Sequence, residues 1–493
     1  MSAEPMEEQA FPNLTVNSTK KLEKSERYLI SKHNQLKQFG SVEDLATDES
    51  ILSEKDREGI LHNLLTVRSI LAKALWKSGI FVGVSVLDEF VLSAAQNGHA
   101  DICGRVIQDL RSAGVERPGF VLYPLTEFGM EIPPLMTASS ELESMAVFLD
   151  ANFAVTAQAN GFDEALANLR KMATALGITA EIHRSDIEHY ARGSNMKWLT
   201  RNPLMLVRLS SHTGDYYENQ FIYTLKIRIA AAQVVMLHAL SIDAGILVEK
   251  FQSSANVNNW ETLDIRHYLV GEATHPEKPI NLRRVPMNVA ALELARLSDL
   301  AVTVSTRTLA RSEVQKWKEK LTPILRSVEV GYLRYVNLSS EEKIHIRVYR
   351  RLVTSIDWYR QSFGSRLKEA ECIVALAVAF ETLLTDYYAP GSAARIQRRV
   401  GICLSSHPNV EVYKSSVLTI YHARSEIVHT GDGGHETEIH RAQAAFAMCF
   451  CEVASRLDQL DRKMLDPIRE LLGDSLTQEE KEAKDAAKEK KEK

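Results

Sequence analysis

The amino-acid sequence predicts a mainly α-helical protein in which a larger, mostly helical N-terminal region with few strands precedes a C-terminal helical bundle. Apolar residues recur at helical spacing along most of the chain. They make up 45% of the sequence and charged residues 25%, as in soluble globular proteins. A chain of 493 residues exceeds one ordinary hydrophobic core, so we expect two or three domains.

The N-terminal part of the chain shows helical periodicity but no motif that indicates a chemistry. Residues 1–20 are polar, which predicts a flexible N-terminus. Residues 21–270 are predicted to form a mostly helical region of unknown function. The exception is residues 118–125, whose aromatic and β-branched side chains between Pro and Gly predict a strand. Periodicity predicts helices over residues 62–75, 86–95, 145–153, 162–176 and 220–247.

Three prolines and mixed charge mark residues 271–287 as the best linker candidate in the chain. We therefore assign residues 271–335 to this linker and to connecting helices. The prolines are Pro276, Pro279 and Pro286. The connecting helices are predicted over residues 290–297 and 309–328.

Residues 336–472 are predicted to form the helical domain, followed by a charged tail at 473–493. The tail is rich in Lys, Glu and Ala, which is typical of a solvated helix or of disorder. RNA binding by the tail is the weaker alternative, because its charges alternate in sign.

Charge, cysteine usage and hydropathy predict a cytoplasmic protein that does not span a membrane. The net charge of −5 argues against a protein that coats nucleic acid, although it allows a local basic groove. The N-terminus lacks the basic-then-apolar order of a signal peptide, and no segment has about 18 uninterrupted apolar residues. An odd, scattered set of cysteines predicts reduced thiols. The cysteines are Cys103, Cys372, Cys403, Cys449 and Cys451.

The most informative segment is residues 413–429, between two strongly periodic helices. On a helical wheel Arg424 falls inside an apolar stripe. Because arginine keeps its proton, Arg424 needs either an internal carboxylate or a cleft that requires positive charge. His429 lies five residues further, about 140° around an ideal helix, so the two side chains do not share a face. The stripe contains Val417, Ile420, Tyr421, Ile427 and Val428.

Two interpretations of this pattern remain open from spacing alone. Arg424 can bind a core carboxylate while His429 caps a helix C-terminus, where a partly cationic imidazole is favoured. Alternatively the two side chains converge on one site. That requires either that the helix unwinds before Gly431 or that a second copy of the chain completes the site.

The run from Tyr421 to Gly431, Tyr-His-Ala-Arg-Ser-Glu-Ile-Val-His-Thr-Gly, resembles the signature of HEPN domains, and most of all the Apea-like branch. The match extends upstream, where residues 356–359 and 373–383 resemble the two helices that precede the motif in that family. Residues 395–400 resemble its intervening basic helix. The resemblance covers about 130 residues of the chain.

The resemblance implies a small helical bundle that forms a homodimer and cleaves RNA without a metal or other cofactor. The family's arginine corresponds to Arg424 and its histidine to His429. Histidine can transfer protons near neutral pH, and arginine can bind phosphate and stabilise a phosphorane-like transition state. Ser425 stands where many HEPN proteins have Asn, Asp or His, which is usual for the Apea-like branch.

Five further residues are candidates for supporting roles. Glu381 is the natural partner for orienting Arg424 or His429, and a structural ion pair is the equal alternative. A basic segment is a candidate for contacting RNA phosphates, although a solvated helix face is the commoner outcome for such a pattern. Tyr421 can stack on a base, but its place on the apolar stripe favours core packing. The basic residues are Arg395, Arg398 and Arg399.

No spacing in the sequence matches a known metal motif. His183, Asp186, Glu188 and His189 are metal-type residues, but the two histidines are six apart and share no helix face, which favours a polar surface helix. Cys449 and Cys451 lie on an apolar helix and are better interpreted as core thiols.

The function that we expect is therefore a metal-independent RNA endonuclease, plausible as a toxin or antiviral effector whose N-terminal region senses or binds a regulatory partner. The biological role rests on the family resemblance alone. Two alternatives stay open. One is a non-catalytic module that binds RNA, a nucleotide or a protein, and the other is a helical scaffold that only dimerises.

Overall fold

The computed structural model describes most of the chain and divides into two compact units. The N-terminal unit comprises residues 1–126, 135–227 and 257–298, and the C-terminal unit comprises residues 127–134, 228–256 and 299–493. The structure describes residues 14, 16–78, 80–113, 118–126, 128–131, 152–159, 161–193, 196–212, 216–246, 267–272, 279–286, 299–337, 342–364, 369–387, 391–430 and 439–476.

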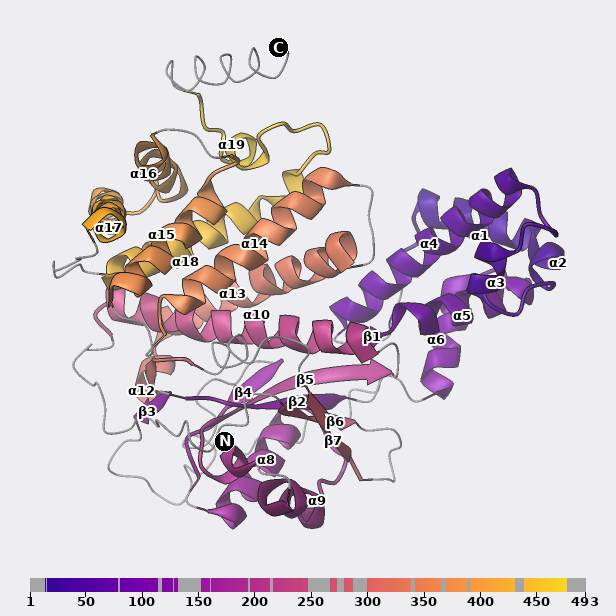
Figure 1. The fold of residues 1–493 in the computed structure, drawn as a ribbon, viewed down its shortest axis with the longest axis horizontal. Helices are drawn as coiled ribbons and strands as arrows, with labels where there is room; N and C mark the ends of the chain where they lie inside the picture. The colour runs from indigo at the N-terminus through magenta and orange to yellow at the C-terminus, as the bar shows by residue number, and fades with distance from the viewer. Residues whose placement is uncertain are drawn as a thin grey trace. The chain divides into compact units, whose positions relative to one another are not determined.

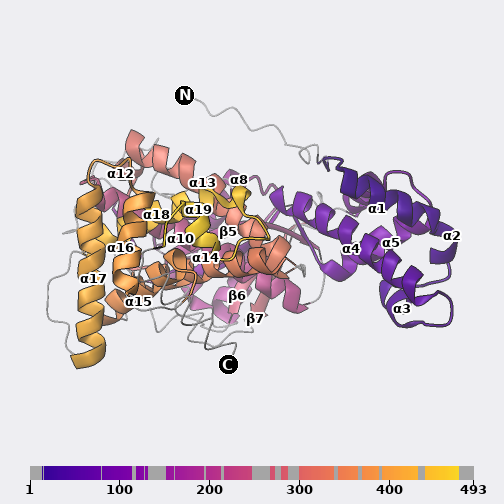
Figure 2. The same cartoon turned by 90° about the horizontal axis from the view of Figure 1, so that it is seen from above.

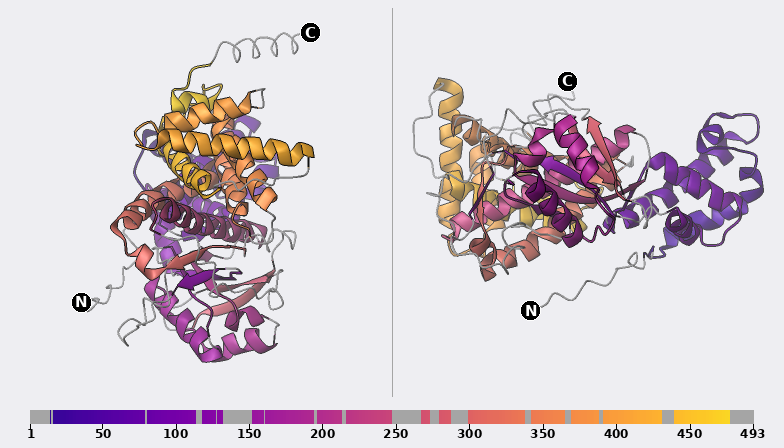
Figure 3. Two further views of the ribbon diagram at one scale, coloured as in Figure 1. Left: turned by 90° about the vertical axis from the view of Figure 1, so that its left-hand side faces the viewer. Right: turned by 90° about the horizontal axis from the view of Figure 1, so that it is seen from below.

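The N-terminal unit begins with a group of helices, drawn in indigo in Figure 3 (right). Several of them start at a Ser, Thr or Asp whose side-chain oxygen accepts the backbone N–H three residues ahead, as Ser53 does from Asp56. The helices are α1 (Lys20–Ser31), α2 (His33–Leu36), α3 (Val42–Thr47), α4 (Glu54–Lys77), α5 (Val84–Gln96) and α6 (Ile102–Ser112).

A mixed sheet forms the second part of this unit. Its described strands run in the order β1-β5-β2-β6-β7, and β4 also pairs with β5. β1 is parallel to β5, whereas the other pairs are antiparallel. The strands are β1 (Ile80–Val82), β2 (Gly119–Pro124), β4 (Phe153–Val155), β5 (Leu204–His212), β6 (His267–Glu272) and β7 (Asn281–Pro286).

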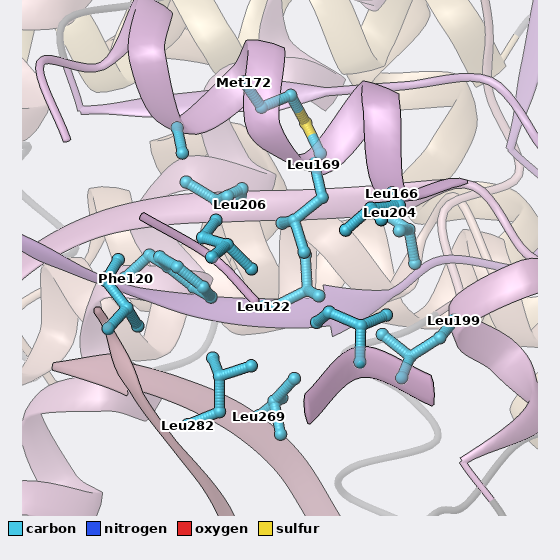
Figure 4. Close-up of a cluster of buried hydrophobic side chains, with 14 of the residues drawn as sticks. Phe120, Leu122, Leu166, Leu169, Met172, Leu199, Leu204, Leu206, Leu269 and Leu282 are labelled. Carbon is cyan, nitrogen blue, oxygen red and sulfur yellow. The ribbon is translucent and has the colours of Figure 1, made fainter. Parts of the chain in front are cut away.

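Leucine side chains fill the space between this sheet and the helices that cover one of its faces. Leu169 and Met172 of α8 (Phe162–Ala175) lie in the same buried cluster as Leu122 of β2 and Leu206 of β5 (Figure 4). The segment that follows α8 contributes Ile187. It consists of α9 (Arg184–Glu188), the π-helical turn η2 (His189–Gly193) and the 3-10 turn η3 (Lys197–Thr200).

We expect Leu169→Ala to lower the free energy of unfolding of the N-terminal unit by about 2–5 kcal/mol, because it removes buried methyl groups and leaves a cavity. Leu169 is 1% exposed and lies in the centre of the cluster. Urea unfolding measures the change. Ala167→Ser, on the exposed face of the same helix, is the control and should leave stability nearly unchanged. Equal effects of the two substitutions would contradict this description of the core.

The prediction that residues 271–287 form a linker is wrong for the part that the structure describes. β6 and β7 pair in antiparallel register from His267–Pro286 to Glu272–Asn281, so this segment contains one side of a hairpin. Pro286 lies at the end of β7, where no further ladder hydrogen bond is lost. The predicted helix at 290–297 lies outside the described residues.

The C-terminal unit is a bundle of helices with a small parallel pair of strands, β3 (Gly129–Glu131) and β8 (Thr303–Ser305). Helix α10 (Tyr216–Asp243) contributes its residues from 228 onward. α14 packs between α13 and α15, as Figure 1 shows. The other helices are α12 (Thr306–Leu309), α13 (Ser312–Tyr332), α14 (Lys343–Gln361), α15 (Glu369–Leu384), α16 (Ser392–Cys403), α17 (Val410–Thr430), α18 (Ile439–Ser455) and α19 (Pro467–Leu472), with the turns η5 (Leu333–Asn337) and η6 (Leu457–Gln459).

Stacked aromatic rings form the centre of this bundle. The ring of Tyr359 on α14 lies 4.3 Å from that of Phe446 on α18, and Phe446 meets Phe380 of α15 edge to face at 5.4 Å. The hydroxyl of Tyr359 donates to the carbonyl of Gln443 over 3.0 Å, so this buried polar group is satisfied. These contacts fix α14, α15 and α18 against one another.

One helix in the described part of the chain is long and apolar enough to cross a membrane, at residues Ile222–Asp243 of α10. It is 89% buried inside the structure, which is consistent with the core helix of a soluble protein. The mainly helical fold with strands in the N-terminal region is confirmed. The helices predicted over residues 162–176, 220–247 and 309–328 correspond to α8, α10 and α13, and the strand predicted over 118–125 corresponds to β2.

Candidate functional site

The Arg424–His429 motif occupies the exposed end of helix α17. The buried side chains of this helix are Tyr413, Val417, Ile420, Tyr421 and Ala423, and none of its residues from Arg424 to Thr430 is buried. Figure 2 shows α17 at the margin of the bundle, reaching past the end of the neighbouring α16. The motif therefore lies on a helix end that is held by the bundle but not enclosed by it.

Helix α17 remains regular through the motif. It is α-helical from Val410 to Thr430, so it does not unwind between Arg424 and His429. The two side chains stay about 140° apart around the axis and about 7.5 Å apart along it. Within one chain they do not converge, and of the two routes to a joint site only a second copy of the chain is left.

Arg424 contacts a carboxylate on one side and is partly exposed to solvent. Its Nη1 lies 3.5 Å from Oε1 of Glu381 on α15, with 36% of the arginine side chain and 28% of the glutamate side chain exposed. This distance is longer than the 2.7–2.9 Å typical of charged hydrogen bonds, so the pair is a loose ion contact. Nε of Arg424 is buried and has no hydrogen-bond partner in the described structure. An anionic ligand can therefore reach the guanidinium through its exposed part and not through Nε.

Arg351 of α14 forms hydrogen bonds with the turn of α15 that carries Glu381. Nη2 of Arg351 donates to the carbonyl of Glu381 over 3.1 Å, and the Thr385 hydroxyl donates to the same carbonyl over 2.6 Å. Nη2 of Arg351 also donates to the carbonyl of Thr385. These bonds satisfy carbonyls at the end of α15 and hold Glu381 in place opposite Arg424.

Tyr421 anchors the helix and is not available to stack on a base. Its hydroxyl donates to the carbonyl of Ala377 on α15 over 2.9 Å. Burial raises the pKa of Tyr421 well above its usual value, so the phenol stays protonated and neutral. The position supports the interpretation of Tyr421 as a core residue, one turn before Arg424.

His429 and Ser425 are both exposed on α17. His429 has no protein partner among the described residues, so its imidazole is free to accept or donate a proton. A second exposed histidine, His422, lies seven residues earlier and therefore on nearly the same face as His429. His422 was not singled out from the sequence, because it is not one of the characteristic positions of the signature that residues 421–431 resemble.

The apolar stripe of α17 continues past the bundle. Ile427 is half-buried and Val428 is 61% exposed, although both lie on the stripe that buries Val417 and Ile420. Both residues lie inside the motif, and in the described structure their exposed parts form an apolar surface that can pack against another protein.

The three arginines of α16 have a structural role, which corrects the prediction that they contact RNA phosphates or form a solvated face. Nε of Arg399 donates to Asp474 over 2.9 Å and its Nη1 lies 3.2 Å from Asp386, with 2% of the arginine side chain exposed. Arg398 donates to both carboxylate oxygens of Asp474, over 2.8 and 2.9 Å. Arg395 is buried, with its guanidinium 5.6 Å from the Tyr387 ring.

This ion network attaches the C-terminal segment to the bundle. Asp386 also accepts the backbone N–H groups of Ile468 and Arg469 at the start of α19, over 2.8 and 3.0 Å. Burial acts to raise the pKa of Asp474, but the hydrogen bonds and charges of Arg398 and Arg399 outweigh it and hold the pKa below its usual value. Asp474 is therefore charged at neutral pH and pairs with both arginines.

The described residues contain no group of three His, Cys, Asp or Glu side chains arranged to hold a metal ion. In the segment with two histidines, His183 lies 3.4 Å from Glu181, and Glu188 pairs with Arg192 over 2.6 Å. Cys449 and Cys451 are buried core thiols, as the sequence suggested, and burial raises the pKa of Cys451 to about 12.

No protein-family model, curated protein or solved structure matches the chain.

Proposed function

We propose that the chain is a metal-independent RNA endonuclease of the HEPN type, with an active site formed by Arg424 and His429 of two copies of the C-terminal unit. The observation that carries the proposal is the position of the motif on the exposed last turns of α17. Beyond Ala423, the last buried residue of α17, the helix carries an arginine in loose ion contact with Glu381 and a histidine without a partner among the described residues.

The chemistry of these two side chains suits cleavage of RNA by its own 2′-hydroxyl. His429 takes the proton from the attacking hydroxyl or gives one to the leaving oxygen, as a histidine acting as general base or general acid does. Arg424 presents its free donors to the phosphate oxygens, where negative charge develops in the transition state. Glu381 limits the rotation of the guanidinium without covering its outer edge.

A second copy of the chain would allow Arg424 and His429 to meet, although the two residues lie about 140° apart on one helix. An isologous dimer along the exposed stripe would bury Val428 and Ile427 of both copies and bring Arg424 of one copy close to His429 of the other. The extra burial of apolar surface favours this association. A toxin or antiviral effector, with the N-terminal unit as the part that binds a regulator, is the biological role that fits such an enzyme.

The test of the proposed activity is RNA cleavage by the full-length protein in EDTA, with analysis of the product ends. The proposal expects cleavage that survives chelation and leaves 2′,3′-cyclic phosphate and 5′-hydroxyl ends, as attack by the 2′-hydroxyl requires. Products with 5′-phosphate ends, or activity that EDTA removes, would contradict it. An intact, folded protein that binds RNA but never cuts it would favour the non-catalytic binding module.

The test of the shared site is to mix Arg424→Ala with His429→Ala after each has been shown to fold. If each site takes Arg424 from one copy and His429 from the other, a heterodimer retains one intact site. Random exchange then restores about one quarter of the wild-type activity, because half of the dimers are mixed and each has one working site of two. No recovery, in a mixture shown to exchange subunits, would contradict the shared site but leave the cleavage chemistry standing.

A further inference from the structure

Helix α14 has an exposed basic face in a protein that carries a net negative charge. Lys343, Arg347 and Arg350 are spaced at intervals of four and three residues, so they lie on one side of the helix, and all three are exposed. They extend over about 10 Å of the helix axis. Thr354 continues the same exposed face, which carries no large apolar residue.

A second segment of the chain adds two cations to this face. Nη2 of Arg347 donates to the carbonyl of Leu465 over 3.0 Å, which places the segment 461–465 beside α14. This segment carries the exposed Arg462 and Lys463. We call these five residues the α14 basic surface: Lys343, Arg347, Arg350, Arg462 and Lys463.

None of the five cations has an acidic partner in the part of the C-terminal unit that the structure describes. The acidic residues near this end of α14 have other contacts or are exposed. Glu342 contacts His345 over 3.1 Å, and Asp461 accepts the backbone N–H of Lys463 over 2.8 Å. Glu470 accepts the backbone N–H groups of Leu465 and Asp466, and the carboxylates of Glu470 and Asp466 both contact Arg469, while Asp458 is exposed. By contrast, six arginines elsewhere in this unit contact a carboxylate: Arg360 with Asp357, Arg398 and Arg399 with Asp474, Arg424 with Glu381, Arg456 with Glu452 and Arg469 with Asp466.

Helix α14, which carries the α14 basic surface, also contacts the candidate site, but through a different side. Arg351 donates to the carbonyl of Glu381, whose carboxylate contacts Arg424. Arg350 lies about 100° further around the helix, near Tyr332 of α13. A membrane surface fits less well, because among the described residues this surface offers one large exposed apolar side chain, Leu465 at 75% exposed, and not the apolar face of an interfacial helix.

We propose that the α14 basic surface binds the phosphate backbone of RNA. This inference rests on the proposed function for the identity of the ligand. The α14 basic surface would take the RNA-binding role that the sequence suggested for the arginines of α16, of which Arg398 and Arg399 are engaged in the ion network. Unpaired lysines and arginines bind backbone phosphates through charge, so the recognition is independent of base sequence and sensitive to salt.

The test measures binding of a fluorescein-labelled single-stranded RNA of mixed sequence by anisotropy, at several salt concentrations. The full-length His429→Ala protein is the reference, so that the probe stays uncut. We expect Lys343→Gln/Arg350→Gln to weaken binding roughly tenfold and to reduce the slope of log affinity against log salt by about 1.4, because two phosphate contacts are lost.

The matched control is Lys316→Gln/Lys320→Gln, two exposed lysines of α13 whose removal changes the net charge equally. This control should bind RNA as the reference does. Equal weakening by both pairs would show a general charge effect and overturn the α14 basic surface. Unchanged binding by the α14 pair would overturn it too, while cleavage by the wild-type protein would still support the nuclease.

The two proposals fail in distinguishable ways. Suppose that the reference protein binds RNA, that the two α14 substitutions weaken this binding, and that the wild-type protein never cuts RNA. These results together would support the α14 basic surface and contradict the nuclease. A reference protein that binds phosphatidylserine vesicles but not RNA would overturn the inference in favour of a lipid ligand.

Discussion

We expect His429→Ala and Arg424→Ala each to reduce the rate of RNA cleavage by a factor of about 100 to 10,000, the range for loss of a general acid–base or of a charge that stabilises the transition state. His429 is exposed, and Arg424 is partly exposed with one loose ion contact, to Glu381. The substitutions should therefore leave folding intact. Cleavage of a labelled RNA in EDTA, with circular dichroism and size-exclusion profiles for each variant, measures both effects.

The chain offers a matched control for each substitution. His422→Ala removes an exposed histidine from nearly the same face of α17 but outside the motif, and should leave the rate unchanged. Arg424→Lys keeps the charge but loses the planar donor set, so it should recover only a small part of the activity. If His422→Ala lowered the cleavage rate as much as His429→Ala, the loss would be due to a change on this face of α17 and not to the motif residue. Full activity of Arg424→Ala would make Arg424 a structural residue.

The local pattern of α17 was predictable because it depends on residues close together in the sequence. The stripe of Val417, Ile420 and Tyr421 is buried, and Arg424 meets the carboxylate that a partly buried guanidinium needs. Glu381 was identified as that partner. What the pattern could not predict is where the bundle ends along the helix. Val428 continues the stripe yet is exposed, since burial depends on the neighbouring helices.

The role of the α16 arginines could not be predicted, because their partners are distant in the sequence. Arg399 binds Asp474, 75 residues away, and Asp386, 13 residues away. A run of three arginines in six residues is equally compatible with a solvated face, a phosphate contact or a buried ion network. Only the packing of the C-terminal segment against α16 decides between these outcomes.

The strands of the N-terminal unit were largely missed for a different reason. The sequence of β5 begins Leu-Met-Leu-Val, a short apolar run that periodicity cannot separate from a buried helix. β6 and β7 are short, and β7 falls inside residues 271–287, whose three prolines and mixed charge were interpreted as a linker. Pairing between strands far apart in the sequence, as between β2 and β6, leaves little local signal.

The ion network of α16 gives the largest expected effect on stability. We expect Arg399→Met to lower the free energy of unfolding by about 3–5 kcal/mol, because Asp386 and Asp474 then remain buried without this partner. The side chains of Asp386 and Asp474 are 2% and 1% exposed. Arg398→Met is the matched control. It removes a 30% exposed arginine from the same carboxylate and should cost much less.

The pH dependence of this effect follows from the lowered pKa of Asp474. A group with a depressed pKa in the folded state stabilises the protein above its unfolded pKa of about 3.9, and that stabilisation is lost as the pH falls through the folded value. The stability difference between the wild type and Asp474→Asn should therefore be complete at pH 6 and shrink below about pH 4.

Hydrogen–deuterium exchange of peptides from α16 and α19, together with urea unfolding, locates the loss of stability in this network. Faster exchange confined to these two helices in Arg399→Met is expected, because Asp386 holds the start of α19 and Asp474 follows its end. Arg399→Met with the stability and exchange of the wild type would mean that the ion network contributes nothing net. In that case α16 would be held by its apolar side chains, Ile396 and Val400, alone.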